Sequence, residues 1–180
     1  MSTPDRRVLV TSASRHGATR EIVQALAARL QAAPGVHAVH VPVEHAPDPA
    51  VWDAVVVGSA VYAGRWLEPA RDWVAARAGL LRGRPVWLFS SGPIGPPPLP
   101  ADDPHDVLAL QQLTAARGHG LFPGRLDPAL LSFGERAVVT AMRAPVGDFR
   151  DWPAVTAWAD GIAAELAAAA GLTARPAATR

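Results

Sequence analysis

The stretch RRVLVTSASRHGATREIVQALAARL, residues 6–30, predicts a strand, a loop and a helix in direct succession. Val8, Leu9 and Val10 form an unbroken apolar run, which is typical of a strand buried on both faces of a parallel sheet. From Ile22 to Leu30 the apolar residues recur at helical spacing, so they share one face of a helix. The loop between these two elements is rich in hydroxyl groups and contains a glycine.

This loop is a candidate anion site, because the first turn of a helix leaves backbone N–H groups without partners. Ser12, Ser14 and Thr19 supply hydroxyl donors, and Gly17 would let the backbone approach a ligand closely. The plainer alternative is that Ser14 or Thr19 only caps the helix. We favour a site for a phosphate group.

The spacing excludes two common phosphate motifs. The chain has neither the G-x-x-x-x-G-K-[ST] motif of nucleoside triphosphatases nor the G-x-G-x-x-G motif of dinucleotide-binding proteins. It contains no lysine, since all 17 of its basic residues are arginine. A hydroxyl-rich loop without lysine favours a monophosphate, such as that of flavin mononucleotide (FMN), over a triphosphate.

The composition is that of a globular protein with a substantial core, since 49% of its 180 residues are hydrophobic and 18% are charged. No apolar run reaches the roughly 18 residues of a membrane span, and no hydrophobic stretch follows the charged N-terminus, so we expect a cytoplasmic protein. The net charge of +1, with arginines spread along the chain, indicates no nucleic-acid surface. Without cysteine, redox chemistry would need a bound cofactor, and we expect no metal site.

Two later loops are also rich in Ser, Gly and small residues: VVVGSAVYAGRW at 55–66 and the end of PVWLFSSGPIG at 85–95. Both follow apolar strands, and open α/β sheets bind their ligands where parallel strands end. Tyr62, the only tyrosine, could stack on a planar ring or simply cover its loop. The alternative to a shared ligand site is that the three loops are ordinary strand–helix turns, because such turns also favour Gly and Ser.

The remaining pattern alternates strands with helices. We expect a second strand over 36–43, a weak edge strand over 119–126, and helices over 66–78 and from Pro104, Pro128 and Trp152. The alternation predicts an α/β fold, a doubly wound five-stranded parallel sheet in the order 2-1-3-4-5 with helices on both faces. We expect one domain over residues 1–170 and a flexible tail over 171–180.

Three segments resemble the flavodoxin-domain family: SASRHGATREI, VVVGSAVYAGRW and FRDWPAVTAWADGIAAEL. They are most similar to its branch of menaquinone-dependent protoporphyrinogen dehydrogenases, and the likeness covers roughly residues 7–166. The resemblance implies a flavodoxin-like fold with FMN as cofactor. It implies that the FMN phosphate is held by Ser12, Ser14, Arg15, His16, Gly17, Ala18 and Thr19. It further implies that the flavin ring lies between Ser59, Ala60, Val61, Tyr62 and Gly64 on one side and Ser91, Gly92 and Pro93 on the other.

The chain departs from that branch in two places. His16 stands where the branch usually has an acidic residue, which changes the charge of the first loop. The basic, aromatic insertion of the protoporphyrinogen enzymes is thin here, and what remains of it is Arg125, Phe133, Arg136 and Arg143. Arginines of this kind would pair the two propionates of a porphyrin, although exposed arginine on a helix is ordinarily just solvated.

These observations predict an FMN-dependent oxidoreductase acting on a small molecule, either a porphyrinogen or a quinone. The flavin carries the chemistry, so we expect no catalytic side chain. One alternative is a soluble flavodoxin-type electron carrier, although such carriers usually present an acidic surface and this chain has a net charge of +1. Another is a flavodoxin fold that has lost its flavin and serves as an interaction module. Peripheral contact with the inner face of the membrane through residues 127–142, and a homodimer, stay open.

Overall fold

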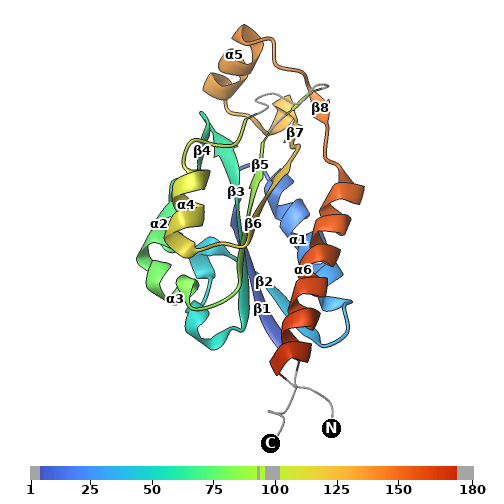
Figure 1. The fold of residues 1–180 in the computed structure, drawn as a ribbon. Helices are drawn as coiled ribbons and strands as arrows, with labels where there is room; N and C mark the ends of the chain where they lie inside the picture. The colour runs from blue at the N-terminus through green and yellow to red at the C-terminus, as the bar shows by residue number, and fades with distance from the viewer. Residues whose placement is uncertain (1–4, 93, 96–101, 174–180) are drawn as a thin grey trace, which may run out of the picture.

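A parallel sheet forms the centre of the molecule (Figure 1). The computed structural model describes residues 5–92, 94–95 and 102–173. In this part of the chain the parallel strands are β1 (Arg6–Ala13), β2 (Val36–Pro42), β3 (Ala54–Tyr62), β5 (Val86–Ser91) and β6 (Gly118–Phe122). They lie in the order β2-β1-β3-β5-β6, with the short β4 (Arg65–Trp66) antiparallel to the end of β3. The predicted order 2-1-3-4-5 is therefore confirmed, with β2 and β6 at the edges.

Helices cover both faces of the sheet (Figure 1). One face carries α1 (Ala18–Gln31) and α6 (Trp152–Thr173), and the other carries α2 (Glu68–Ala76), α3 (Ala78–Arg82) and α4 (Val107–Thr114). Val8 and Val10 belong to the core cluster of α1 and α6, whereas Leu9 belongs to the opposite cluster. This alternation follows from the two-residue period of a strand and explains why the run must be apolar throughout.

A further segment, residues 123–151, stands above the carboxyl ends of the strands, and we call it the cap (Figure 1). Its two short strands β7 (Arg125–Leu126) and β8 (Gly147–Asp148) pair antiparallel. Between them lie the 3-10 turn η3 (Pro128–Leu130) and the helix α5 (Phe133–Ala141). Two further 3-10 turns, η1 (Val43–His45) and η2 (Pro49–Val51), connect β2 to β3.

One buried arginine ties the cap to the sheet domain. The guanidinium of Arg150, whose side chain is 5% exposed, pairs with Asp148 of β8 and with Glu21 in the first turn of α1, each at 2.5 Å. These carboxylates raise the pKa of Arg150 further above its ordinary value. Arg125 also approaches Glu21, at 3.3 Å. The cap is thus fixed to the start of α1, beside the loop that sequence analysis singled out.

The helix expected over 66–78 begins later and is divided. Trp66 lies in β4 instead, because its backbone N–H donates to the Asp106 carboxylate at 3.1 Å and its indole N–H donates to Ser90 Oγ at 2.7 Å. The helix starts at Glu68 and breaks at Arg77, where the backbone leaves helical geometry (φ −117°, ψ 12°).

Two predicted helix starts were wrong. In both cases the helix was expected to begin at an Asp-Pro pair, and it begins a few residues after that pair. Helix α4 begins at Val107 rather than Pro104, directly after Asp106. Pro128 opens only η3; α5 begins after Ser132, whose hydroxyl accepts the N–H of Glu135. Phe133, the first residue of α5, is 87% exposed.

The last helix agrees with expectation at its start and extends beyond it at its end. Asp151 Oδ1 accepts the N–H of Ala154 at 2.9 Å, which is the expected cap. Helix α6 then continues to Thr173, past the boundary at residue 170 where the tail was expected, and residues 174–180 lie outside the described part. No helix within the described residues combines the length and the apolar character that crossing a bilayer requires.

Candidate functional site

A cavity of about 390 Å³ lies between the carboxyl edge of the sheet and the cap. The three loops that sequence analysis grouped together all reach it. The predicted site residues that line it are Ser14, Arg15, His16, Ala18, Thr19, Ala60, Val61, Tyr62, Ser91 and Gly92. Its other wall comes from the cap and includes Leu131, Glu135 and Val138. The grouping of the loops at one edge was predictable from parallel strands, whereas the cap wall was not predicted.

The start of α1 is open toward this cavity. Gly17 precedes the helix in a left-handed conformation (φ +86°), which glycine adopts without strain, and no side chain caps the helix from that position. Ser14 Oγ accepts the N–H of Arg20 at 3.3 Å, as the capping alternative allowed. The N–H groups of Ala18 and Thr19 make no hydrogen bond with any described residue. Two backbone donors therefore remain for an anion, with the Ser14 and Thr19 hydroxyls beside them.

Tyr62 lies at the junction of the first and second loops. The Arg15 guanidinium carbon is 5.2 Å from the centre of its ring, and the His16 ring meets it edge-on at 6.2 Å. Burial raises the pKa of the Tyr62 hydroxyl, and the charge of Glu135 adds to the rise. The expected stacking of Tyr62 on a ligand ring stays a prediction. In the structure Tyr62 contacts Arg15 and His16 of the first loop, which is compatible with the alternative role of covering a loop.

Glu135 connects the cap to the first loop, and sequence reasoning missed it. Its carboxylate lies 3.0 Å from Arg15 Nε and 3.1 Å from His16 Nε2. Hydrogen bonds from Ser132 are the main cause that lowers the pKa of Glu135 to about 2, and His16 and Arg15 contribute. The S-x-x-E spacing of Ser132 and Glu135 is a capping-box signal that could have located both this helix start and this carboxylate.

Two predicted serines do not line the cavity. Ser59 is fully buried, and its hydroxyl donates to the Ala60 carbonyl at 2.8 Å and accepts the N–H of Leu67 at 2.9 Å. It therefore joins the end of β3 to the start of α2. Ser12 is also buried, at 4% exposure, beneath the loop. The Ser59 hydroxyl is thus used inside the fold, and neither serine is part of the cavity lining.

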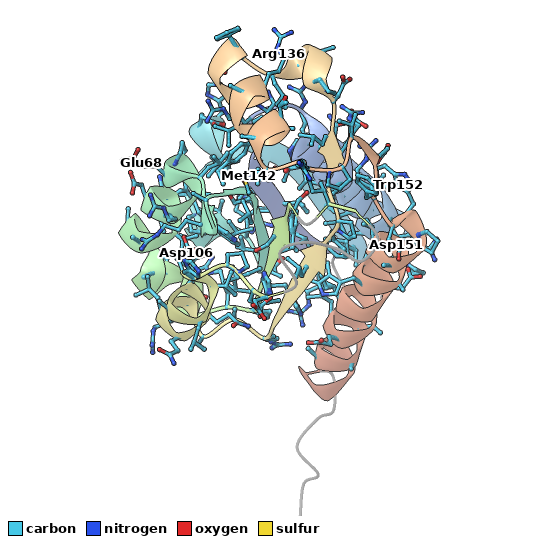
Figure 2. The ribbon with its side chains drawn as sticks, turned by 90° about the horizontal axis from the view of Figure 1, so that it is seen from above. Glu68, Asp106, Arg136, Met142, Asp151 and Trp152 are labelled. Atoms are coloured by element: carbon cyan, nitrogen blue, oxygen red, sulfur yellow. The ribbon has the colours of Figure 1, made fainter. Side chains whose placement is uncertain are left out.

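Gly64 lies at a second cavity of about 580 Å³, which adjoins the first along Val61, Gly92 and Ile94. The remaining walls of this second cavity come from Ala63, Leu121 and residues 102–105 and 142–145. Figure 2, which looks down on the carboxyl edge of the sheet, shows Met142 over this region and Arg136 on the outer side of α5. Pro93, the last of the predicted site residues, lies outside the described residues.

The donor set of the first cavity fits the phosphate of FMN. A left-handed glycine opens the helix N-terminus, two backbone N–H groups and two hydroxyls lie there, and Arg15, which pairs with Glu135 at 3.0 Å, lines the same cavity without a lysine. Apolar groups of Val61 and the cap complete a chamber in the size range of small-ligand sites.

A doubly wound parallel sheet with an open helix N-terminus at its switch point defines a flavodoxin-like α/β protein. A family model described as the flavodoxin domain matches residues 9–151. The chain therefore belongs to the flavodoxin domain family, and the matched region includes the cap. No curated protein matches the chain.

Solved structures share the fold at low sequence identity. Rubredoxin:oxygen oxidoreductase from Desulfovibrio gigas matches with a TM-score of 0.64 and 13% identity over 92% of this chain, which spans only 37% of that protein. A flavodoxin mutant from Pseudomonas aeruginosa matches with a TM-score of 0.57 and 16% identity over 89% of this chain and 99% of its own. A WrbA-like flavodoxin from Agrobacterium tumefaciens matches with a TM-score of 0.55 and 14% identity over 93% of this chain and 99% of its own. Identities this low establish the fold alone.

Proposed function

We propose that this protein binds FMN in the first cavity and is an FMN-dependent oxidoreductase that acts on a small molecule. The observation that carries the proposal is the open N-terminus of α1, which faces a chamber where three sheet-edge loops meet the cap. The flavodoxin family supports FMN as the ligand. When bound, the flavin ring would accept and donate electrons, and the protein would bind it, orient it and control access to it.

The residues divide into two groups by chemistry. The N–H groups of Ala18 and Thr19, the hydroxyls of Ser14 and Thr19 and the charge of Arg15 would hold the phosphate. The apolar lining from Val61 and the cap would exclude water from the ring site. No side chain in this scheme has to transfer a proton, which is consistent with a cofactor that carries the chemistry.

An enzyme is better supported than an electron carrier. A small carrier uses an acidic surface to reach its partner, and the formal net charge of this chain is +1. A second cavity that adjoins the first also offers room for a small molecule. The unpaired donors at the start of α1 argue against a module that has lost its ligand site.

Of the two substrates, a quinone has more support than a porphyrinogen. The four residues expected to meet porphyrin propionates do not gather at one surface. Arg125 pairs with Glu21 at the first cavity, Phe133 and Arg136 line a shallow groove on the outside of α5, and Arg143 lines the second cavity. Porphyrinogen oxidation stays a second candidate that rests on the resemblance alone.

Location and assembly stay predictions. We propose a cytoplasmic location. Formation of a homodimer and peripheral contact with the inner face of the membrane would both use the outer surface of α5 in the cap. There Phe133 and Met142 are 87% and 74% exposed.

Quinone turnover separates the enzyme from the carrier. The FMN-loaded protein should oxidise a reduced nicotinamide or dithionite-reduced flavin pool with 2-methyl-1,4-naphthoquinone as acceptor, and it should fail to replace a flavodoxin in a reductase-coupled carrier assay. The Pseudomonas aeruginosa flavodoxin serves as the matched control in both assays. Efficient carrier activity without quinone turnover would contradict the proposal.

A further inference from the structure

The second cavity adjoins the candidate flavin site. Val61, Gly92 and Ile94 line both cavities, so a molecule in one would be separated from a molecule in the other by no more than these residues. At about 580 Å³ the second cavity is large enough for a small ligand of its own. Electrons pass between a flavin and a small molecule only at close approach, and this arrangement provides it.

Backbone conformations that side chains rarely adopt are concentrated around this cavity. Among the described residues, three that are not glycine have a positive φ, and two of them, Ala63 (φ 48°) and Arg143 (φ 51°), line the second cavity. Each is unfavourable for the folded state and persists only where the surrounding structure enforces it. Gly64 (φ +71°) lies between Ala63 and His105, and a Cβ there would meet the His105 ring at 3.0 Å.

Two hydrogen bonds and one His–Asp contact form a chain that ends at the wall formed by residues 102–105. The Trp66 indole N–H donates to Ser90 Oγ at 2.7 Å, and Ser90 Oγ lies 2.8 Å from His119 Nε2. His119 Nδ1 lies 3.3 Å from Asp103 Oδ1. The chain crosses from β4 through β5 and β6 to the cavity wall.

The direction of these hydrogen bonds follows from the Trp66 end. Because the indole can only donate, the Ser90 hydroxyl is free to donate to Nε2, which leaves the proton of a neutral His119 on Nδ1, facing Asp103. The His119 side chain is 6% exposed and Ser90 is fully buried. Ser90 is therefore closed to any substrate, and the group acts as a support rather than as a nucleophile.

The charges at the cavity indicate the chemistry of its ligand. The carboxylate of Asp103 is engaged by His119, whereas the Arg143 guanidinium has no ion pair or hydrogen bond with any described residue. His105 and Arg143 are the basic side chains among its lining residues and can donate hydrogen bonds, Asp102 is a second carboxylate there, and most of the remaining lining is apolar. A ligand that matches has an apolar ring with oxygen acceptors at its edge.

We propose that the second cavity binds the small molecule that exchanges electrons with the flavin, an apolar ring bearing oxygen acceptors, and that His119 is a positioning residue that holds the Asp103 wall. The inference rests on the proposed function, because it takes the first cavity as the flavin site. It adds where the redox partner binds and which residues shape that place.

Filling the second cavity tests its role directly. Ala144 lines the second cavity alone, and Ala137 lies on the outside of the same cap. In FMN-loaded protein, Ala144→Trp should weaken binding of 2-methyl-1,4-naphthoquinone, measured by calorimetry, by about tenfold or more, because the indole occupies the ligand's volume. Its KM should rise in parallel, while FMN affinity stays unchanged. Ala137→Trp is the matched control and should leave both affinities unchanged.

Two conservative variants of His119 test the positioning role. His119→Gln places an acceptor near Ser90 and loses the donor to Asp103, whereas His119→Asn keeps a donor near Asp103. The Gln variant should raise KM for the quinone with kcat and FMN affinity unchanged, and the Asn variant should stay close to the natural protein. A fall in kcat with unchanged KM, or equal effects from both variants, would overturn the positioning role.

The outcomes separate this inference from the function on which it rests. If no FMN binds to the natural protein, the proposed function fails. If FMN binds and the quinone is reduced, but Ala144→Trp binds quinone as tightly as the natural protein, the second cavity is not the partner site and only this inference is overturned. Should Ala144→Trp fail to fold, Ala144→Leu, a smaller intrusion at the same position, decides between the two results.

Discussion

Gly58 should be one of the least replaceable residues in the chain, because the Phe89 ring occupies the space that a side chain at position 58 would need. The two residues face each other across β3 and β5. A Cβ on residue 58 would lie 2.0 Å from Phe89 Cζ and 2.1 Å from Cε1, which no pair of atoms can share. The Phe89 ring is fully buried and packs against Phe122 and Trp158 with ring centres 6.0 and 6.1 Å away. Gly58→Ala therefore requires the ring or the two strands to move.

The cost follows from which of these gives way. Displacing the strands amounts to overpacking, at about 1–3 kcal/mol, and expelling the ring approaches the cost of losing a buried Phe, about 3–5 kcal/mol. We expect Gly58→Ala to lower the free energy of unfolding by about 3 kcal/mol, a large part of the 5–15 kcal/mol typical of a whole domain. Urea unfolding followed by circular dichroism measures this.

Two controls make the reasoning refutable. Gly79, inside α3, has no atom within 4 Å of its would-be Cβ, so Gly79→Ala should stabilise the protein by about 0.5–1 kcal/mol. In a Phe89→Ala background the clash is gone, so adding Gly58→Ala should cost less than about 1 kcal/mol. If Gly58→Ala costs the same with and without the Phe89 ring, the steric account is wrong.

Three further perturbations address the cap. The pKa of Glu135 is lowered to about 2 in the folded state, so its carboxylate contributes stability that is complete above the ordinary pKa of 4.5 and is lost as the pH falls toward about 2. Glu135→Gln should remove this contribution. Measuring the free energy of unfolding as a function of pH checks it, and the same loss of stability with falling pH in the variant and the natural protein would contradict it. Arg150→Ala leaves Glu21 and Asp148 without their shared partner, so amide hydrogen exchange should quicken across the cap and in the first turn of α1, with the centre of the sheet unaffected. Ser132→Ala removes one half of the capping box and should speed exchange in α5 alone, for a local loss of about 1 kcal/mol; equal exchange in α6 would mean that the effect is not local.

The sheet and its order could be predicted because the signal is local. Runs such as Val8–Val10 and Val55–Val57 are apolar on both sides, which is a requirement of central parallel strands and is readable from a few residues. Parallel strands joined by helices leave few topologies, and the convergence of the three loops at one edge then follows. The individual residues of these loops that line the cavity were named in advance through the resemblance to the flavodoxin-domain family.

The helix starts and the cap depended on contacts that no local pattern carries. Asp106, forty residues away in sequence, binds the N–H of Trp66 and places it in a strand. The Ser59 hydroxyl is taken up by Leu67, so a residue with the right chemistry for a ligand is used inside the fold. Glu135 reaches Arg15 from a segment that was expected to form a helix from Pro128, with no role at the first loop. These pairings arise only after the chain has folded.

The central claim is that the start of α1 binds the phosphate of FMN, and one measurement tests it most directly. Purified protein is mixed with FMN, desalted and examined by absorbance, beside a variant carrying Ser14→Ala and Thr19→Ala and a control carrying Thr140→Ala, which lies on the outside of the cap. The account predicts a retained flavin spectrum in the natural protein and the control, and its loss in the double variant. No retained or titratable flavin at any FMN concentration in the natural protein would contradict the account.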